Sequence, residues 1–259
     1  MALRVVSRCL TSRVTTRVTS RSFSADVEDD RGHDEPLYEG HLPTNLLQKA
    51  ILAAGSAAVA LGDPWRADMV AVNAEVTGKR ALTSMHRRML GNTEGRQILK
   101  DRPRINTKTV DFEALKALPS NTLGHSYAAY CAEQKITPDS RDPVNFVDDP
   151  DLAYVMTRYR EVHDLMHTVL DLPTNMVGEV GVKWVEALQT GLPMCAGGAI
   201  FGPGRFKTER QMREFRRLRP WVIRVGSEAD FLMNVYFEKH WEQDLLEFRQ
   251  ERNIEARPL

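Results

Sequence analysis

The amino-acid sequence predicts an all-α fold, built as a single domain of many helices. Two observations support this prediction: apolar residues recur at intervals of three and four along most of the chain, and the period-two alternation typical of strands is nearly absent. A chain of 259 residues with 42% hydrophobic and 27% charged side chains can bury one substantial core. This composition argues against a disordered chain, an integral membrane bundle and a disulfide-stapled mini-protein.

Residues 1–25 have the composition of a mitochondrial presequence. They hold five arginines and nine serine or threonine residues, and the first acidic side chain is Asp26. Every fourth residue of one stretch is apolar, namely Val6, Leu10, Val14 and Val18. We therefore expect a transient amphipathic helix and cleavage by a matrix protease after Phe23, with a disordered basic arm as the alternative.

The charge of the chain changes once this segment is removed. The whole sequence has 35 basic and 35 acidic side chains, so loss of the five arginines leaves 30 against 35 and a net charge of −5. A net-acidic protein lacks the broad basic surface of a general nucleic-acid binder. Residues 26–40, with seven acidic side chains, predict a solvated linker, and the folded domain is expected over 41–259, starting near Tyr38.

The first predicted helix follows Pro43 and Thr44 and ends at Gly62. Its uncharged stretch from Ala50 to Gly62 has only 13 residues, too few to cross roughly 30 Å of bilayer hydrocarbon. No other stretch does better, so no transmembrane helix is predicted. We expect a core helix, with a helix on a membrane surface as the alternative.

Further helices are predicted between glycine and proline breaks. They cover residues 65–77, 80–90, 93–101, 111–118 and 121–135. The two cysteines outside the presequence, Cys131 and Cys195, have no CxxC or Cys/His spacing, which excludes a disulfide framework and a thiolate zinc site. We expect both to be buried apolar residues rather than nucleophiles.

The C-terminal half begins with an acidic cap at Asp149 and a proline in the first helical turn. The helix opened there should reach Leu172, and a second should run from about Thr174 to Thr190. Four glycines within residues 195–204 predict a loop. The last helices are expected over 208–218 and 228–251, the latter opened by Ser227.

Polar residues on the apolar face of the helix from Pro150 carry the candidate chemistry. His163 and His167 are four residues apart, so their imidazoles can converge on one metal ion about 2.0–2.1 Å away. Asp164 lies between them, and Pro173 turns the chain back. Because Glu179 follows Pro173 by six residues and His167 precedes it by six, the two should be level across an antiparallel helical hairpin.

One divalent cation can satisfy all four of these polar groups, which are costly to bury separately. Two imidazoles and two carboxylates suit Zn²⁺, the ion we expect first, or Fe²⁺, Mn²⁺ and Co²⁺, better than Ca²⁺. The alternative is a satisfied His-Asp pair in the core and an unrelated surface Glu. The predicted metal ligands are therefore His163, Asp164, His167 and Glu179.

Two hydrolase motifs partly resemble the pentapeptide from His163 to His167, but neither matches it fully. The HExxH zinc-hydrolase motif has Glu as general base where this chain has the shorter Asp164. HD-type phosphohydrolases use an isolated upstream His and a distant Asp, without a His four residues after the pair. A metal-dependent hydrolase of HDxxH type is kept as an alternative.

The pattern H-D-x-x-H-x11-E, filled by His163, Asp164, His167 and Glu179, resembles the signature of the coenzyme Q biosynthesis protein 4 family. The resemblance runs from about Tyr38 nearly to the C-terminus, and its other matching stretches are Tyr38-Glu39-Gly40-His41, Asp142-Pro143-Val144 and Gly202-Pro203. It implies a mainly α-helical protein, peripheral on the matrix side of the mitochondrial inner membrane, within the multi-enzyme complex that makes ubiquinone.

The resemblance also implies a reaction. Family members are thought to remove the C1 carboxylate of a polyprenylated 4-hydroxy-3-methoxybenzoate, with hydroxylation of that carbon as a further coupled step, and to organise the complex. The four ligands would act through the bound metal, and dioxygen would favour a redox-active ion over Zn²⁺. A non-catalytic, lipid-binding scaffold is the alternative.

A polyprenyl tail would need an apolar channel that opens at the membrane. Basic residues over 205–219 could steer the net-acidic protein toward anionic lipid. A solvated helix face or a contact with a partner protein explains them equally well, and a homo-oligomer is left open.

Overall fold

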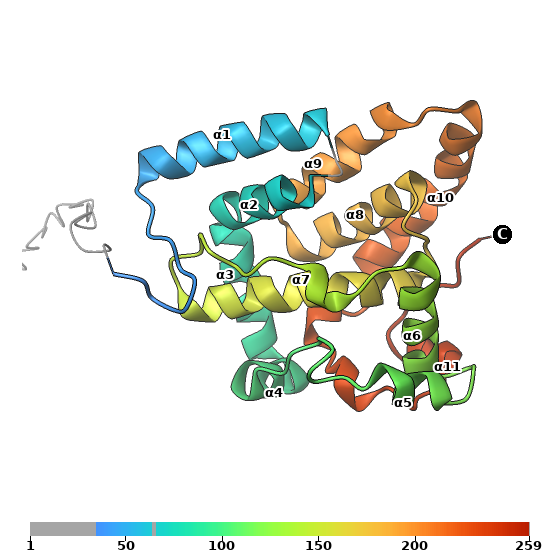
Figure 1. Ribbon diagram of the computed structural model, residues 1–259. Helices are drawn as coiled ribbons and strands as arrows, with labels where there is room; N and C mark the ends of the chain where they lie inside the picture. The colour runs from blue at the N-terminus through green and yellow to red at the C-terminus, as the bar shows by residue number, and fades with distance from the viewer. Residues whose placement is uncertain (1–34, 64–65, 259) are drawn as a thin grey trace, which may run out of the picture. The chain divides into compact units, whose positions relative to one another are not determined.

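The computed structural model describes residues 35–63 and 66–258 (Figure 1). These residues form eleven α-helices and four short 3₁₀-helices without a β-strand, which confirms the predicted all-α class. The predicted presequence and residues 26–34 of the linker lie outside the described residues. Within the described part, no helix has both the length and the apolar character needed to cross a membrane.

The first six helices lie close to the predicted segments, and side-chain caps fix the starts of four of them. Asn45, Asn92 and Thr122 each accept a hydrogen bond from a backbone N–H of the helix that they precede. The bounds are α1 Leu46–Gly62, α2 Ala67–Thr77, α3 Lys79–Gly91, α4 Thr93–Asp101, α5 Phe112–Ala117 and α6 Leu123–Gln134. A 3₁₀ turn, Pro138–Ser140, follows α6.

Helix α7, Pro150–Leu170, is the central element, since its N-terminal half packs in one hydrophobic cluster and its C-terminal half in the other. Asp149 caps it with a side chain that accepts from the N–H groups of Asp151 and Leu152. It ends where Asp171 adopts a left-handed conformation with φ 52°. Helix α8, Met176–Thr190, then returns antiparallel to it, as the hairpin prediction requires.

The predicted loop over 195–204 is wrong. Residues Pro193–Phe201 form helix α9, which continues into a 3₁₀ turn, Gly202–Arg205. Two of the four glycines serve close packing rather than a loop: a Cβ added at Gly198 would lie 3.2 Å from Cγ of Lys183, and one at Gly202 would overlap a methyl group of Val180. Helix α9 can therefore lie against α8.

The two last predicted helices are also wrong in their bounds. Helix α10, Glu209–Glu228, passes through Pro220 because buried residues such as Trp221 and Val225 continue its apolar face against α8. Residues 231–237 are apolar at nearly every position, without a helical period, and run through the core as 3₁₀ turns. These turns are Leu232–Asn234 and Phe237–Lys239, and the chain closes with helix α11, Leu245–Glu251.

The expectation of a core helix over the first apolar segment is contradicted. In α1 only Ser56 is buried, while Leu46, Leu47 and Ile51 are 79%, 70% and 64% exposed. Helix α1 packs on α2 along one side only, so its other side faces outward (Figure 1). The two remaining cysteines are free and buried as predicted.

The packing of α9 on α8 predicts an effect at Gly202. The substitution Gly202→Ala should lower the free energy of unfolding by about 1–3 kcal/mol, because the new methyl group must displace the buried Val180 side chain. Gly204→Ala, in the same turn but with nothing within 4 Å of an added Cβ, is the matched control. Urea denaturation of both variants checks this, and equal loss in both would contradict the packing described.

Candidate metal centre

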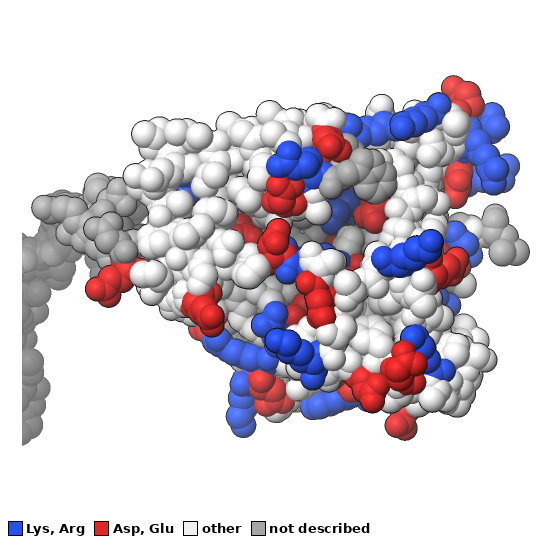
Figure 2. All heavy atoms as spheres, viewed as in Figure 1, with Lys and Arg blue, Asp and Glu red and all other residues white. Residues whose placement is uncertain are grey.

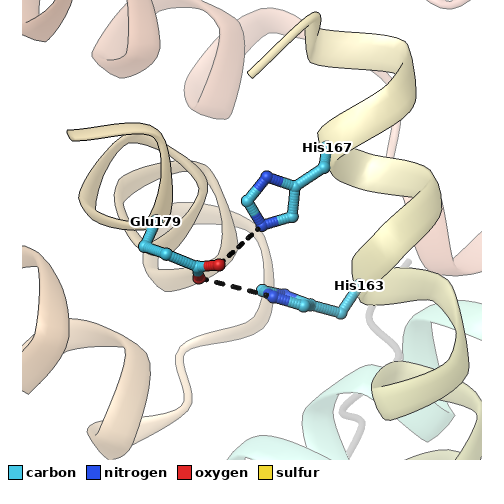
Figure 3. Close-up of side chains that lie close together, drawn as sticks. All are labelled: His163, His167 and Glu179. Atoms are coloured by element: carbon cyan, nitrogen blue, oxygen red, sulfur yellow. Dashed lines mark ion pairs between the residues drawn. The ribbon is translucent and has the colours of Figure 1, made fainter. Parts of the chain in front are cut away.

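The hairpin of α7 and α8 brings His163, His167 and Glu179 together (Figure 3). The Nε2 atoms of His163 and His167 lie 3.6 Å and 3.5 Å from the two carboxylate oxygens of Glu179. The two rings are nearly perpendicular, at 84°, with centroids 4.9 Å apart. One ligand atom from each of the three residues falls within 4.8 Å of the others. His167 and Glu179 therefore lie opposite each other across the hairpin.

The hydrogen bonds of the two imidazoles leave both Nε2 atoms free to bind a cation. His163 Nδ1 donates to Oε1 of Glu186 at 2.6 Å, and His167 Nδ1 donates to the carbonyl of Leu172 at 2.9 Å. Because carboxylates and carbonyls only accept, each Nδ1 carries the hydrogen and each neutral ring keeps a lone pair on Nε2. The Nε2 atom of His167 is buried and has no hydrogen-bond partner.

The spacing also fits a cation. The Nε2–carboxylate distances of 3.5 Å and 3.6 Å exceed those of ordinary hydrogen bonds. Ligand atoms at about 2.0–2.1 Å from a tetrahedral ion lie roughly 3.3 Å apart. An orphaned buried nitrogen, two fixed tautomers and this spacing together fit a divalent ion held by three protein ligands.

A buried polar network contacts His163 at Nδ1, the ring nitrogen that does not face Glu179. The Glu186 side chain is fully buried, and its Oε2 accepts from Lys183 Nζ at 2.6 Å and from the Tyr159 hydroxyl at 2.9 Å. Burial alone would raise the pKa of Glu186, but Lys183 and His163 hold it well below its usual range. Glu186 raises the pKa of Lys183 to about 12 against the effect of burial. The network holds a carboxylate against His163, as partners of metal-bound histidines do.

Asp164, the fourth predicted ligand, lies elsewhere in the structure. Its Oδ1 accepts a hydrogen bond from Arg141 Nη2 at 2.5 Å, and it is absent from the group of three. The role of Asp164 as a metal ligand therefore stays a prediction. A general-base role of the hydrolase kind would require this carboxylate to leave Arg141.

The sequence analysis missed Glu186, Lys183, Arg141 and Tyr130. The first two could have been found, since Glu179, Lys183 and Glu186 are spaced by four and three residues and share one face of α8. Arg141 lies in a segment without periodicity, and only the fold shows its partner. The Tyr130 ring stacks on His167 with centroids 5.8 Å apart, and its buried hydroxyl has no hydrogen-bond partner.

Electrostatics keep the acidic ligand ionised and the phenol neutral. Burial acts to raise the pKa of Glu179, but His163 and His167, in their protonated forms, hold it well below its usual range through hydrogen bonds and positive charge. Burial raises the pKa of the Tyr130 hydroxyl, and Asp164 and Glu179 raise it further. The centre therefore combines an ionised carboxylate with a neutral phenol donor beside the second imidazole.

Comparisons with known proteins give one family. The family described as "Coenzyme Q (ubiquinone) biosynthesis protein Coq4" matches residues 38–258. A relative from Culex quinquefasciatus, "Ubiquinone biosynthesis protein COQ4 homolog 1, mitochondrial", is 52% identical over 94% of this chain and 92% of its own. A human relative, "Ubiquinone biosynthesis protein COQ4 homolog, mitochondrial", is 50% identical over 86% of this chain and 84% of its own.

A solved structure shares the fold. The crystal structure of a protein from Nostoc punctiforme, whose description also refers to ubiquinone biosynthesis, superposes with a TM-score of 0.63. It covers 83% of this chain and 100% of its own at 20% sequence identity. This similarity supports the arrangement of the helices.

Loss of a ligand should remove the ion. We expect His167→Ala and Glu179→Gln to purify with far less divalent metal than the unchanged protein, because two ligands hold an ion poorly. His86→Ala, on α3 and outside the group, is the control. Elemental analysis by mass spectrometry measures the metal, and equal content in all four proteins would contradict the site.

Acid should release the ion at an unusually high pH. Burial and Lys183 act to lower the pKa of His163, but Glu186 and Glu179 outweigh them and raise it. Protons compete with the ion for Nε2, so affinity should fall as the pH decreases through this raised pKa. Glu186→Gln should weaken binding about 10–100-fold at neutral pH and move release to lower pH. Titration with a fluorescent chelator measures both, and unchanged release in this variant would show that Glu186 does not act on His163.

Proposed function

We propose a function from the premise that this chain belongs to the coenzyme Q (ubiquinone) biosynthesis protein Coq4 family and acts in ubiquinone biosynthesis. The hairpin of α7 and α8 holds one divalent metal ion and removes the C1 carboxylate of a polyprenylated 4-hydroxy-3-methoxybenzoate. The observation that supports a metal-dependent enzyme is the convergence of two fixed Nε2 atoms on the Glu179 carboxylate. Zn²⁺ is the first candidate ion, with Fe²⁺, Mn²⁺ and Co²⁺ as alternatives.

Loss of the carboxylate leaves an electron pair on C1, which a proton must take up as CO₂ departs. A bound divalent ion would supply Lewis acidity toward the carboxylate or phenolate oxygens of the ring. His163, His167 and Glu179 would hold it, and Glu186 and the Leu172 carbonyl keep both imidazoles in the required tautomer.

Two further groups are placed to handle the substrate. The neutral Tyr130 hydroxyl, stacked beside His167, can donate a hydrogen bond to an oxygen of the ring substituents. Arg141 forms an ion pair with Asp164, which follows His163 in the sequence, and could exchange that partner for the carboxylate of a benzoate. Hydroxylation of C1 in the same step would require dioxygen and a redox-active ion.

The names of the relatives place those proteins in mitochondria, and the composition of residues 1–25 predicts the same compartment for this chain. We propose a peripheral position on the matrix side of the inner membrane, because the polyprenyl tail keeps the substrate in the bilayer. Other enzymes of ubiquinone biosynthesis are the proposed partners, in a complex that this protein also helps to organise.

The decisive experiment separates the enzyme from a scaffold. Glu179→Gln and Asp164→Asn are expressed in cells that lack the endogenous protein, and intermediates and the complex are measured together. We expect both variants to accumulate the carboxylated intermediate and to make at least about 100-fold less ubiquinone, with the complex intact. Normal ubiquinone synthesis by a stable, metal-free Glu179→Gln protein would leave only the scaffold role.

A further inference from the structure

The outer face of α1 carries no charged side chain. Its exposed residues between positions 46 and 62 are Leu, Ile, Val, Ala and Gly, apart from Gln48. The largest of them, Leu46, Leu47, Ile51 and Leu61, are all at least 49% exposed. A helix on the surface of a protein in water ordinarily alternates such residues with charged ones. In Figure 2 the surface over α1 is correspondingly white.

Polar contacts on the inner side fix this orientation. Asn73 Nδ2, on α2, donates to the Ala53 carbonyl at 3.1 Å and to the Ser56 hydroxyl at 3.2 Å. Lys49 is the single ionisable residue of α1, and it forms an ion pair with Asp148. The helix is therefore held with its apolar face outward, and the charge of Lys49 is paired with Asp148 on the inner side.

Apolar and basic surfaces meet at the C-terminal end of α1. Ile200 and Phe201, at the end of α9, are 62% and 60% exposed. Arg205 Nη1 donates to the Gly62 carbonyl at 3.2 Å, and a cleft of about 520 Å³ is lined by Phe201, Arg205 and Lys207 together with the end of α1. Figure 2 shows blue side chains gathered over the segment that follows α9.

We propose that α1 and the end of α9 form the membrane-docking face of the protein, with α1 lying in the plane of an anionic bilayer. A 17-residue helix presents an apolar strip about 25 Å long, which suits the headgroup–acyl boundary. Arg205 and Lys207 lie beside it and meet the lipid phosphates. The inference rests on the proposed function for the membrane location of the substrate and not for the metal chemistry.

The composition of the face favours lipid over a protein partner. Protein interfaces centre on aromatic or arginine side chains in pockets and carry a polar rim. The strip on α1 is aliphatic, and the basic residues beside it, Arg205 and Lys207, lie at its C-terminal end. The docking face thus takes up the alternative that the sequence left open for the first apolar helix, a position on a membrane surface, and joins it to the first basic residues of the segment 205–219.

Vesicle binding tests the face. Protein purified from mitochondria is mixed with vesicles of phosphatidylcholine and cardiolipin, and the fraction that floats with lipid is measured for Leu47→Glu/Ile51→Glu. The control, Leu90→Glu/Leu246→Glu, changes leucines that are 48% and 58% exposed on α3 and α11. We expect the first pair to lower partitioning at least about tenfold and the control to bind like the unchanged protein. Arg205→Ala/Lys207→Ala should reduce binding only at low salt.

Metal content and circular dichroism accompany each measurement, so failure of docking is distinguished from failure of the metal site. If the glutamate pair unfolds, Leu47→Ser/Ile51→Ser is measured in its place against the same criterion. Equal vesicle binding by the α1 variant and the control would overturn the proposal. It would also be overturned if the unchanged protein did not bind vesicles; analytical ultracentrifugation then shows whether α1 instead joins two copies of the chain, in which case substitution of α1 would dissociate them.

Discussion

The contact between the His163 imidazole and the buried Glu186 carboxylate fixes how α7 and α8 face each other. A fully buried carboxylate loses its hydration and is tolerated only where donors replace the lost water. Glu186 receives such donors from His163, Lys183 and Tyr159, so that both of its oxygens accept hydrogen bonds. The same contact aims Nε2 of His163 at Glu179, so the network that stabilises the hairpin also prepares the candidate site.

The rest of the fold supplies the conditions for this contact. Helix α7 is enclosed along most of its length, which keeps water from the polar residues that it carries. Helix α8 is held from its other side by α10 and by α9 with the turn that follows it, which can approach closely because Gly198 and Gly202 have no side chains. Rigid support of this kind lets three ligand atoms keep their spacing before any ion binds.

Local signals predicted what depends on neighbours in sequence. A cap such as Asp149 fixes a helix start, and the spacing of His163, His167 and Glu179 about Pro173 predicts their meeting across a hairpin. Features that depend on contacts between distant segments could not be predicted from the sequence. The glycines of residues 195–204 predicted a loop, because the sequence does not show the surface of α8 against which this segment packs. Helix α1 was predicted to be a core helix because its composition is apolar. Only the fold shows that nothing in the described chain covers its outer side.

X-ray absorption at the metal edge of the purified protein tests the central claim most directly, because it identifies the ion and its ligands together. The account predicts one bound divalent ion with two imidazoles and at least one carboxylate oxygen at about 2.0–2.2 Å. A sample that carries no ion, or an ion whose spectrum shows sulfur ligands and no imidazole, would contradict it.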